Sequence, residues 1–186
     1  MARVSVFNHV SLDGYFTDQK GDMNWAHRGE DPEWNAFAAE NAKGGGVMLF
    51  GRVTYEMMAS YWPTPPALEQ YPIVAKRMND GQKVVFSRTL DKATWKNTKL
   101  VKSDPAGEVR KMKKASGGDM VIMGSGTIVS QLAQAGLIDE YQIVVNPIVL
   151  GQGRTLFEGL KSKVNLKRTK SRAFGNGNVF VCYEPG

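Results

Sequence analysis

The sequence predicts an α/β fold with three layers (α/β/α), in which a mixed, mostly parallel β-sheet is covered by helices on both faces. Three observations carry this prediction. Short apolar runs alternate with helix-like segments, a glycine turn leads directly from a strand into a helix at residues 124–126, and residues 164–183 have the pattern of an antiparallel hairpin. The 186 residues suffice for a sizeable core, and no Pro/Ser-rich linker divides them, so we expect one domain over residues 1–186.

The first strand is expected at Arg3–Val10, and it ends at the turn-prone sequence Ser11-Leu12-Asp13-Gly14. A long loop follows. Asp31-Pro32-Glu33 then begins a helix, because proline and acidic side chains suit the first turn, and Gly44-Gly45-Gly46 ends it.

The middle of the chain is expected to add more buried strands. Val47–Phe50 is a short apolar run typical of a buried strand, and Gly51-Arg52 leads from it into a helix. Lys83–Phe86 is a second such run, followed directly by Ser87-Arg88, and Leu100-Val101 indicates another strand.

A basic helix is expected after Ser103-Asp104-Pro105, and the next strand at Asp119–Met123. The turn Gly124-Ser125-Gly126 could reverse the chain in a hairpin, but the apolar residues beyond it have helical spacing: Ile128, Val129, Leu132 and Ala135. A strand, a tight glycine turn and a helix bring free N–H groups to the positive end of a helix, which suits a phosphate. Many turns of this kind in α/β proteins bind nothing, so the signal alone is weak.

The end of the chain is expected to be β-structure. After a helix that ends near Gly136, Tyr141–Val145 is rich in strand-forming residues. Val164–Arg172 and Asn178–Tyr183 then form an antiparallel pair about the turn Gly175-Asn176-Gly177.

The formal net charge of +6 comes largely from two clusters: Arg110, Lys111, Lys113 and Lys114, and the residues from Lys161 to Arg172. Two solvated faces explain both clusters most simply, although a basic field also attracts phosphorylated small molecules. Nucleic-acid binding would need aromatic residues among the basic ones, and neither cluster contains them. We therefore expect a small-molecule substrate and no nucleic-acid partner.

Other classes are excluded by what the sequence lacks. No stretch approaches the roughly 20 apolar residues of a membrane span, and the chain starts with a strand-like pattern instead of a signal peptide. The single Cys182 rules out an intrachain disulfide and indicates a reducing compartment, most simply the cytoplasm. His9 and His27 are the only histidines, so no metal site is expected.

In open α/β sheets, ligands bind beyond the carboxyl ends of the strands. Three of these ends carry informative residues: Gly51-Arg52-Val53-Thr54, Ser87-Arg88 and Gly124-Ser125-Gly126-Thr127. Two arginines, several hydroxyls and two helix N-termini are thus expected on one rim. Such a rim suits a ligand with more than one phosphate.

The ordered set of motifs resembles the dihydrofolate reductase fold, and more closely the C-terminal reductase domain of the bifunctional riboflavin-biosynthesis deaminase-reductase and its stand-alone relatives. The matching pieces are "SLDGYFT", "LFGRVTYEMM", "VVFSR", "VIMGSGTIVSQLAQAGLIDEYQIVVNPIVLGQG" and "LF". They cover nearly the whole chain, and the long run is the most distinctive. The resemblance implies a single reductase domain without the zinc-deaminase half.

The resemblance further implies NADPH as the cofactor. The adenosine-side phosphates would be bound by Gly51, Arg52, Thr54, Ser87 and Arg88, and the pyrophosphate and nicotinamide ribose by Gly124, Ser125, Gly126, Thr127 and Ile128. An arginine fork beside a hydroxyl matches a phosphate dianion, which favours NADPH over NADH; without the resemblance both arginines could be plain surface charges. Dihydrofolate reductases have a cis peptide at the corresponding glycine pair, and Ser125 makes that bond costlier here.

For the reacting end, the resemblance implies that strand one and the following loop flank the nicotinamide and the substrate: Phe7, Asn8, His9, Ser11, Asp13, Tyr15 and Phe16. Glu33 and Asp31 are candidate proton donors, although each could equally be a helix-start charge, and Asn35 or Phe37 could occupy the corresponding position. His9 could supply or orient a proton, or be structural. Trp25, Trp34 and Trp62 could line a pocket for a flat ring, or belong to the core.

The leading functional hypothesis is an NADPH-dependent reductase of the riboflavin-pathway type, transferring hydride to a ribosylaminopyrimidine phosphate or a related small electrophile. The missing deaminase half and the lack of a clear substrate-phosphate arginine beyond Arg3 and Arg28 count against that exact pathway step. A dihydrofolate reductase and a non-catalytic nucleotide-binding protein are the alternatives, and an RNA-binding domain is the weakest, since it rests on net charge alone.

If the chain is a reductase, one groove should run from Arg52 and Arg88 past Gly124–Thr127 to Asn8, with an open pocket beside Trp62 or Glu33. A groove closed at the Asn8 end by His9, Phe16 or Trp25 would favour the binder. A homodimer is also expected, because relatives commonly pair through the sheet edge or the C-terminal strands.

Overall fold

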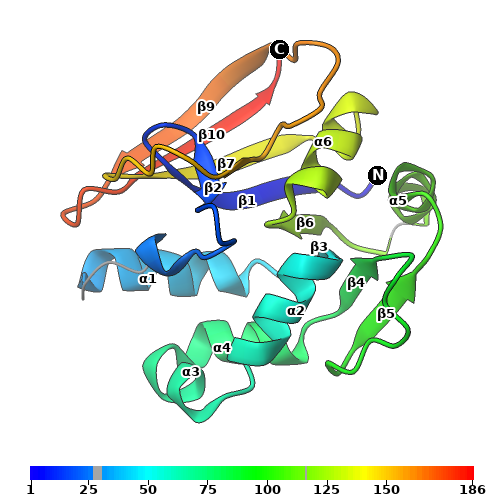
Figure 1. The fold of residues 1–186 in the computed structure, drawn as a ribbon, viewed down its shortest axis with the longest axis horizontal. Coiled ribbons are helices and arrows are strands. Elements are labelled where there is room, and N and C mark those ends of the chain that lie inside the picture. Colours follow the sequence, from blue (N-terminus) through cyan, green and yellow to red (C-terminus); the bar gives the residue numbers. More distant parts are fainter. Residues whose placement is uncertain (27–30, 116) are drawn as a thin grey trace.

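The computed structural model describes residues 1–26, 31–115 and 117–186, and it contains one large mixed sheet of eight strands (Figure 1). Their order across the sheet is β5-β4-β3-β6-β1-β7-β10-β9. The strands are β1 (Val4–Ser11), β3 (Val47–Gly51), β4 (Lys83–Phe86), β5 (Thr98–Val101), β6 (Met120–Met123), β7 (Glu140–Asn146), β9 (Leu166–Ala173) and β10 (Val179–Pro185). The strands from β5 to β7 are parallel, and β10 is antiparallel to both its neighbours, which confirms the predicted sheet.

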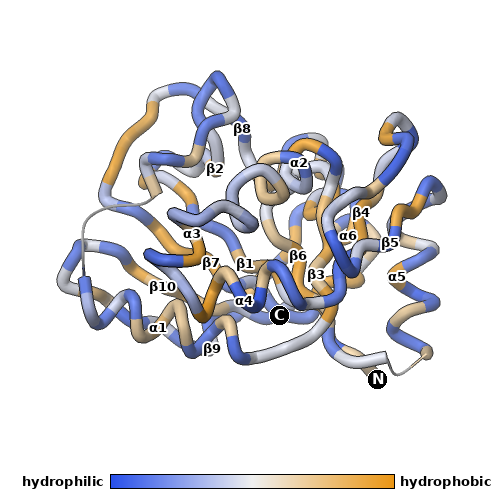
Figure 2. Tube along the Cα trace, turned by 90° about the horizontal axis from the view of Figure 1, so that it is seen from below, coloured by the Kyte–Doolittle hydropathy of each residue, from blue (hydrophilic) through white to orange (hydrophobic). Residues whose placement is uncertain are grey.

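Helices cover both faces of this sheet, so the predicted three layers are confirmed. In Figure 1, α1 (Pro32–Lys43), α2 (Arg52–Tyr61), α3 (Pro65–Gln70) and α4 (Pro72–Asp80) lie below the sheet, while α6 (Gly126–Gln134) lies above it. The remaining helix, α5 (Pro105–Lys114), packs beside α6. Figure 2 shows hydrophobic segments along the central strands and mostly hydrophilic outer turns.

Strand β3 shows how the two faces are separated. Val47 and Leu49 pack in the cluster that contains residues of α5 and α6, whereas Met48 and Phe50 pack with residues of α2, α3 and α4. Because successive side chains of a strand point to opposite faces, an uninterrupted apolar run is what a strand covered on both sides requires. Each large apolar side chain fully buried in this way contributes about 1.5–3 kcal/mol.

The helix starts follow the predicted chemistry. The Asp31 carboxylate accepts hydrogen bonds from Glu33 N (2.9 Å) and Trp34 N (3.1 Å), and Pro32 occupies the first turn of α1. Asp104 likewise accepts a bond from Gly107 N (2.7 Å) at the start of α5. Both carboxylates therefore occupy donors that would otherwise be unpaired at a helix N-terminus.

Some elements were not predicted from the sequence. Helices α3 and α4 occupy a region left unassigned, and β2 (Tyr15–Thr17) pairs with β8 (Arg154–Thr155) in a second, two-stranded sheet. A short 3₁₀ helix at Asn24–Ala26 interrupts the predicted long loop. His27 and Arg28 lie outside the described residues. No helix in the described part of the chain is long and apolar enough to cross a membrane.

Candidate active site

The predicted rim is formed by the ends of neighbouring parallel strands. The register aligns Gly51 at the end of β3 with Phe86 at the end of β4, and Phe7 of β1 with Met123 at the end of β6. Since β3 also pairs with β6, the turns that follow β4, β3 and β6 leave the sheet side by side. The three predicted phosphate-binding segments therefore share one edge of the sheet.

Two of these turns are in direct contact. A Cβ atom on Gly51 would collide with Ser125 Oγ, and a Cβ atom on Gly124 would lie 2.6 Å from Thr54 Cγ2. Gly124 (φ 64°) and Ser125 (φ 67°) are both left-handed, and the peptide bond between them is trans, which answers the question the sequence left open. At position 124 the left-handed φ and the contact with Thr54 favour glycine, and at position 51 the absence of a Cβ atom leaves space for the Ser125 side chain.

The start of α2 offers free backbone donors at this rim. Its N-cap is Gly51, and neither α2 nor α6 has a side-chain cap among the described residues, in contrast to α1 and α5. In α6, the N–H groups of Ile128 and Val129 donate to Ser125 O, and the Ile128 side chain is buried in the core. The first turns of α2 and α6 therefore both leave backbone N–H groups at this rim to which an anion could bind.

Gly126 is covered by the protein itself. A Cβ atom there would lie 2.7 Å from Thr155 O and 3.1 Å from Phe16 Cε1. From the sequence, Gly126 was expected to let a pyrophosphate approach the backbone closely. The neighbour that requires this glycine in the structure is the backbone of β8, while Thr127 beside it is exposed.

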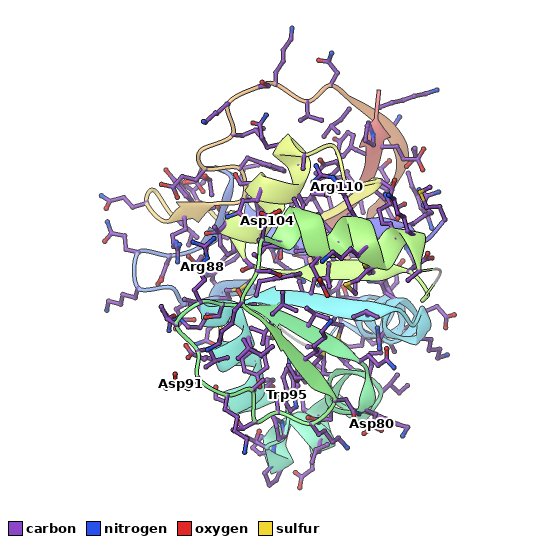
Figure 3. The ribbon with its side chains drawn as sticks, turned by 90° about the vertical axis from the view of Figure 1, so that its right-hand side faces the viewer. Asp80, Arg88, Asp91, Trp95, Asp104 and Arg110 are labelled. Carbon is purple, nitrogen blue, oxygen red and sulfur yellow. The ribbon has the colours of Figure 1, made fainter. Side chains whose placement is uncertain are left out.

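The two rim arginines differ in their partners. Arg52 is half-exposed and pairs with Glu56 (Nη1 to Oε2, 2.9 Å). Arg88 is exposed and has no hydrogen bond or ion pair with any described residue, and Figure 3 shows it on the same edge of the molecule as Asp104. Ser87 Oγ accepts bonds from Thr89 N (3.2 Å) and Leu90 N (2.9 Å), so its lone pairs hold the turn that presents Arg88.

Asn8 connects strand β1 to the glycine turn. Its Oδ1 atom accepts a hydrogen bond from Gly124 N (2.8 Å), while Nδ2 has no partner among the described residues. The side chain is only 3% exposed. Protein atoms therefore enclose the Asn8 side chain in this conformation, and the open groove that leads to it stays a prediction.

His9 lies on the other face of β1. Asn146 Nδ2 is 3.2 Å from His9 Nδ1, and the ring makes edge contacts with Phe7 (centroids 5.9 Å apart) and Trp34 (5.4 Å). The buried Asn146 also donates to Val10 O and Val144 O. Asn146 was not predicted from the sequence, because its role depends on the pairing of β7 with β1.

Asp13 and Ser11 hold the loop that follows β1. The Asp13 carboxylate accepts bonds from Leu150 N (3.1 Å) and Gly151 N (2.7 Å). A hydrogen bond from the Ser11 side chain lowers the pKa of Asp13, and these two backbone bonds lower it further. Ser11 Oγ also accepts a bond from Tyr15 N (2.9 Å). An ionised acceptor in this setting braces the loop and is poorly suited to donate a proton.

The other candidate acids and Trp62 lie apart from Asn8. Glu33 pairs with Arg172 of β9 (2.7 Å), and both side chains are about half-exposed. Asp31 caps α1, and the hydrogen bond from Trp34 N, followed by those from Asn176 N and Glu33 N, lowers its pKa. Trp62 is buried just beyond the far end of α2, where its indole N–H donates to Met58 Sδ (3.1 Å).

An aromatic cluster fills the space between α1 and the sheet. Trp34 and Phe37 of α1 pack against Phe174 and Phe180 of the C-terminal hairpin, with ring centroids 4.7–5.4 Å apart. Phe7 and His9 of β1 extend it toward the rim. Side chains of α1 thus present aromatic rings to β1.

Comparison with known proteins agrees with this geometry. A candidate riboflavin biosynthesis protein from Shewanella sp. PV-4 has 25% identity and a TM-score of 0.77, covering 100% of this chain and 99% of its own. The diaminohydroxyphosphoribosylaminopyrimidine deaminase/5-amino-6-(5-phosphoribosylamino)uracil reductase of Thermotoga maritima has 16% identity and a TM-score of 0.71, covering 100% of this chain and 57% of its own. The NADP(H) complex of Enterococcus faecalis dihydrofolate reductase has 14% identity and a TM-score of 0.65, covering 99% of this chain and 96% of its own.

The two structures with lower identity establish the dihydrofolate reductase-like fold, as the sequence predicted. The family follows from the sequence itself, because residues 2–180 match the model of the RibD C-terminal domain. The chain belongs to the RibD C-terminal domain family.

Proposed function

We propose that this protein is an NADPH-dependent reductase of the riboflavin-biosynthesis type, acting on a small and possibly phosphorylated heterocyclic substrate. The observation that carries the proposal is the rim where Gly51–Thr54 meets Gly124–Ser125. There, a helix start without a side-chain cap lies next to two close glycine turns, and Arg88 on the neighbouring strand end has no partner among the described residues. Family membership agrees with an oxidoreductase.

The rim residues fit the phosphates of this cofactor. The first turn of α2 would receive the pyrophosphate, because its N–H groups have no side-chain cap among the described residues. Arg88, with Arg52 beside it, would hold the 2′-phosphate, and a guanidinium matches a phosphate dianion by paired hydrogen bonds. When bound, the cofactor supplies the hydride.

At the other end, the chain would orient the reactants and exclude water. Asn8 fixes the glycine turn, and His9 and Trp34 offer flat surfaces beside β1. Phe16 and Thr155 cover Gly126, which lies two residues from Gly124, the hydrogen-bond partner of Asn8. We propose that the β2–β8 pair moves aside when a substrate approaches Asn8. Enclosure of this kind strengthens the electrostatic interactions of a reacting pair.

Titration with NADPH and NADH tests the cofactor assignment. Wild type should prefer NADPH, and Arg88→Ala should lose roughly tenfold or more in NADPH affinity, as expected for about 1.5–3 kcal/mol per charged hydrogen bond. NADH affinity should hardly change. Arg110→Ala is the matched control, because Arg110 is equally exposed and lies on α5. Equal affinity of wild type for both nucleotides would refute the assignment.

A substrate panel followed at the NADPH absorbance band tests the reaction. The ribosylaminopyrimidine phosphate should be reduced, while dihydrofolate should not, since the two candidate acids at the start of α1 are engaged, Glu33 with Arg172 and Asp31 as the helix cap. The buried Asn8 favours one alternative, a nucleotide-binding protein without turnover. NADPH binding with no consumption across the panel would support that alternative.

A cytoplasmic homodimer is part of the proposal. Strand β9 is an edge strand whose eight residues are all exposed, so the C-terminal hairpin is free to meet a second copy. Light scattering over a range of concentrations would detect the dimer, and a monomer at every concentration would exclude it.

A further inference from the structure

The loop between β4 and β5, residues 87–97, presents Arg88 at the rim and is anchored at Trp95. The Trp95 backbone N–H donates to Tyr55 Oη (2.9 Å), and its indole N–H donates to Asn79 Oδ1 (2.9 Å). The side chain is 7% exposed and packs against Phe50 and Tyr55. A largely exposed loop thus has one deeply buried attachment point.

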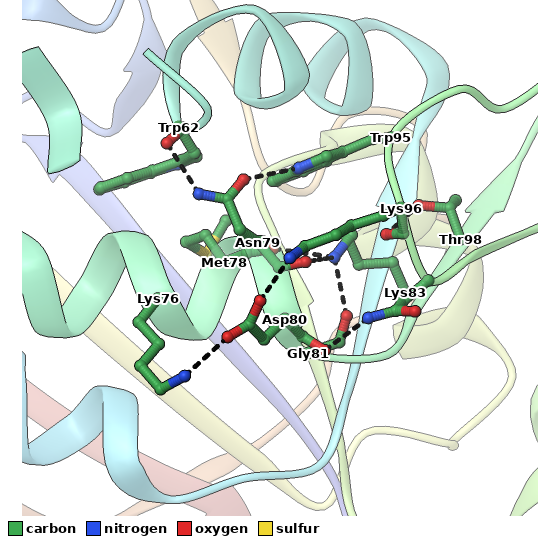
Figure 4. A network of polar contacts seen from close by, with 11 residues as sticks. Trp62, Lys76, Met78, Asn79, Asp80, Gly81, Lys83, Trp95, Lys96 and Thr98 are labelled. Carbon is green, nitrogen blue, oxygen red and sulfur yellow. Dashed lines mark hydrogen bonds and ion pairs between the residues drawn. The ribbon is translucent and has the colours of Figure 1, made fainter. Parts of the chain in front are cut away.

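A polar network fixes the underside of Trp95 (Figure 4). Lys83 Nζ lies 4.5 Å from the indole centroid and donates to the carbonyls of Met78 (2.8 Å), Asn79 (3.1 Å) and Gly81 (2.7 Å). These carbonyls end α4, where a buried ammonium supplies the donors that helix termini lack. Asn79 is held in turn, because its Nδ2 donates to Trp62 O (2.9 Å).

This network reaches the rim through Tyr55. Tyr55 follows Thr54 in the first turn of α2, where the phosphate-binding helix start meets Gly124. Its hydroxyl accepts the Trp95 N–H, so one hydrogen bond joins the start of α2 to the loop of Arg88. Leu90 and Ala93 pack in the same hydrophobic cluster, which leaves the exposed Arg88 between fixed points.

We propose that Tyr55 and Trp95 are positioning residues for Arg88, and that the preference for a 2′-phosphorylated nucleotide depends on them although neither meets the nucleotide. The inference rests on the proposed cofactor site. Because Trp95 N is buried, loss of the Tyr55 hydroxyl leaves that donor without a partner, and the loop gains alternative positions. A phosphate contact through a guanidinium depends on orientation, so a displaced Arg88 loses it.

Tyr55→Phe tests this with the smallest change. The ratio of NADPH to NADH affinity should fall by roughly fivefold or more, with NADH affinity nearly unchanged. Tyr61→Phe is the matched control, because Tyr61 lies on the same helix with its side chain exposed, and its ratio should equal that of wild type. An unchanged ratio in Tyr55→Phe, in a wild type that prefers NADPH, would overturn the positioning role and leave the cofactor assignment intact.

Limited trypsin digestion gives a readout that needs no cofactor, since Arg88 and Lys92 are two of the three cleavage sites within the loop, beside Lys96. Under native conditions, cleavage after these two residues should accelerate several-fold in Tyr55→Phe, with no change in Tyr61→Phe. If cleavage of Tyr55→Phe accelerated evenly over the chain, or did not accelerate, the anchoring of the loop by Tyr55 and Trp95 would be refuted. This result would hold even if wild type did not discriminate between the nucleotides.

Discussion

Raising the pH should stabilise this protein through one buried residue, Lys83. The side chain is 1% exposed, and Nζ is surrounded by three backbone carbonyls and the Trp95 ring. Burial lowers the pKa of Lys83 from 10.5 to about 8, with nearby Arg77 and Lys96 adding to the effect and Asp80 opposing it. Lys83→Met removes the ionisable group and keeps most of the apolar stem, so it serves as the reference.

The sign follows from which state binds the proton. Between pH 8 and pH 10.5 the unfolded chain keeps Lys83 protonated while the folded chain has released it, so the unfolded state binds more protons and the free energy of unfolding rises with pH. The difference between the two pKa values corresponds to about 3 kcal/mol, at about 1.4 kcal/mol per pKa unit. Below about pH 8 both states are protonated, and the cost of burying the charge is constant.

Urea unfolding followed by circular dichroism, at intervals from about pH 7 to about pH 10.5, measures this effect. The free energy of unfolding of wild type relative to Lys83→Met should increase by about 3 kcal/mol across the window. Other titrating groups cancel in the difference. Parallel curves for the two proteins would refute the reasoning, and would mean that the carbonyls and the indole ring fully offset the cost of burial.

Three further outcomes are expected. Asp31→Ala should lower the free energy of unfolding by about 1–2 kcal/mol in urea unfolding, because it removes the cap of α1. Asp31→Asn should keep most of the wild-type stability, because asparagine can also cap a helix. Gly126→Ala should cost about 1–3 kcal/mol through overlap with Thr155 O and lower the thermal midpoint, while Gly117→Ala, which meets open space, should not. Cys182 is 3% exposed and its burial raises the pKa of the thiol to about 11, so mass spectrometry should show no alkylation at pH 8 until the chain unfolds.

The sheet was predictable because its strands have the apolar runs that burial on both faces demands. Val47–Phe50 and Lys83–Phe86 stand out in the sequence for that reason. The short helices α3 and α4 were missed, although Pro65 and Pro72 at their starts were usable signals. The β2–β8 pair was beyond reach, since it joins two or three residues from segments far apart in the chain.

The phosphate rim was predictable in outline because it follows from topology alone. Strand ends of a parallel sheet must meet at one edge, which places Arg52, Thr54, Arg88 and Gly124 together. Side-chain direction does not follow from topology. Glu33 points to Arg172, and Asn146 reaches His9 across strands, which only the register reveals.

The hydrogen bond between Asn8 and Gly124 has a consequence for both ends of the site. Since Asn8 Oδ1 occupies the Gly124 N–H, that donor is not free for a phosphate, and the anion contacts would come from the first turns of α2 and α6. The same bond keeps Asn8 buried at the reacting end. Under the proposed function, nucleotide affinity should therefore depend on the exposed rim, and turnover should also require access to Asn8. A variant can lose turnover and keep NADPH binding, and this separation is what distinguishes a reductase from a binder of the same fold.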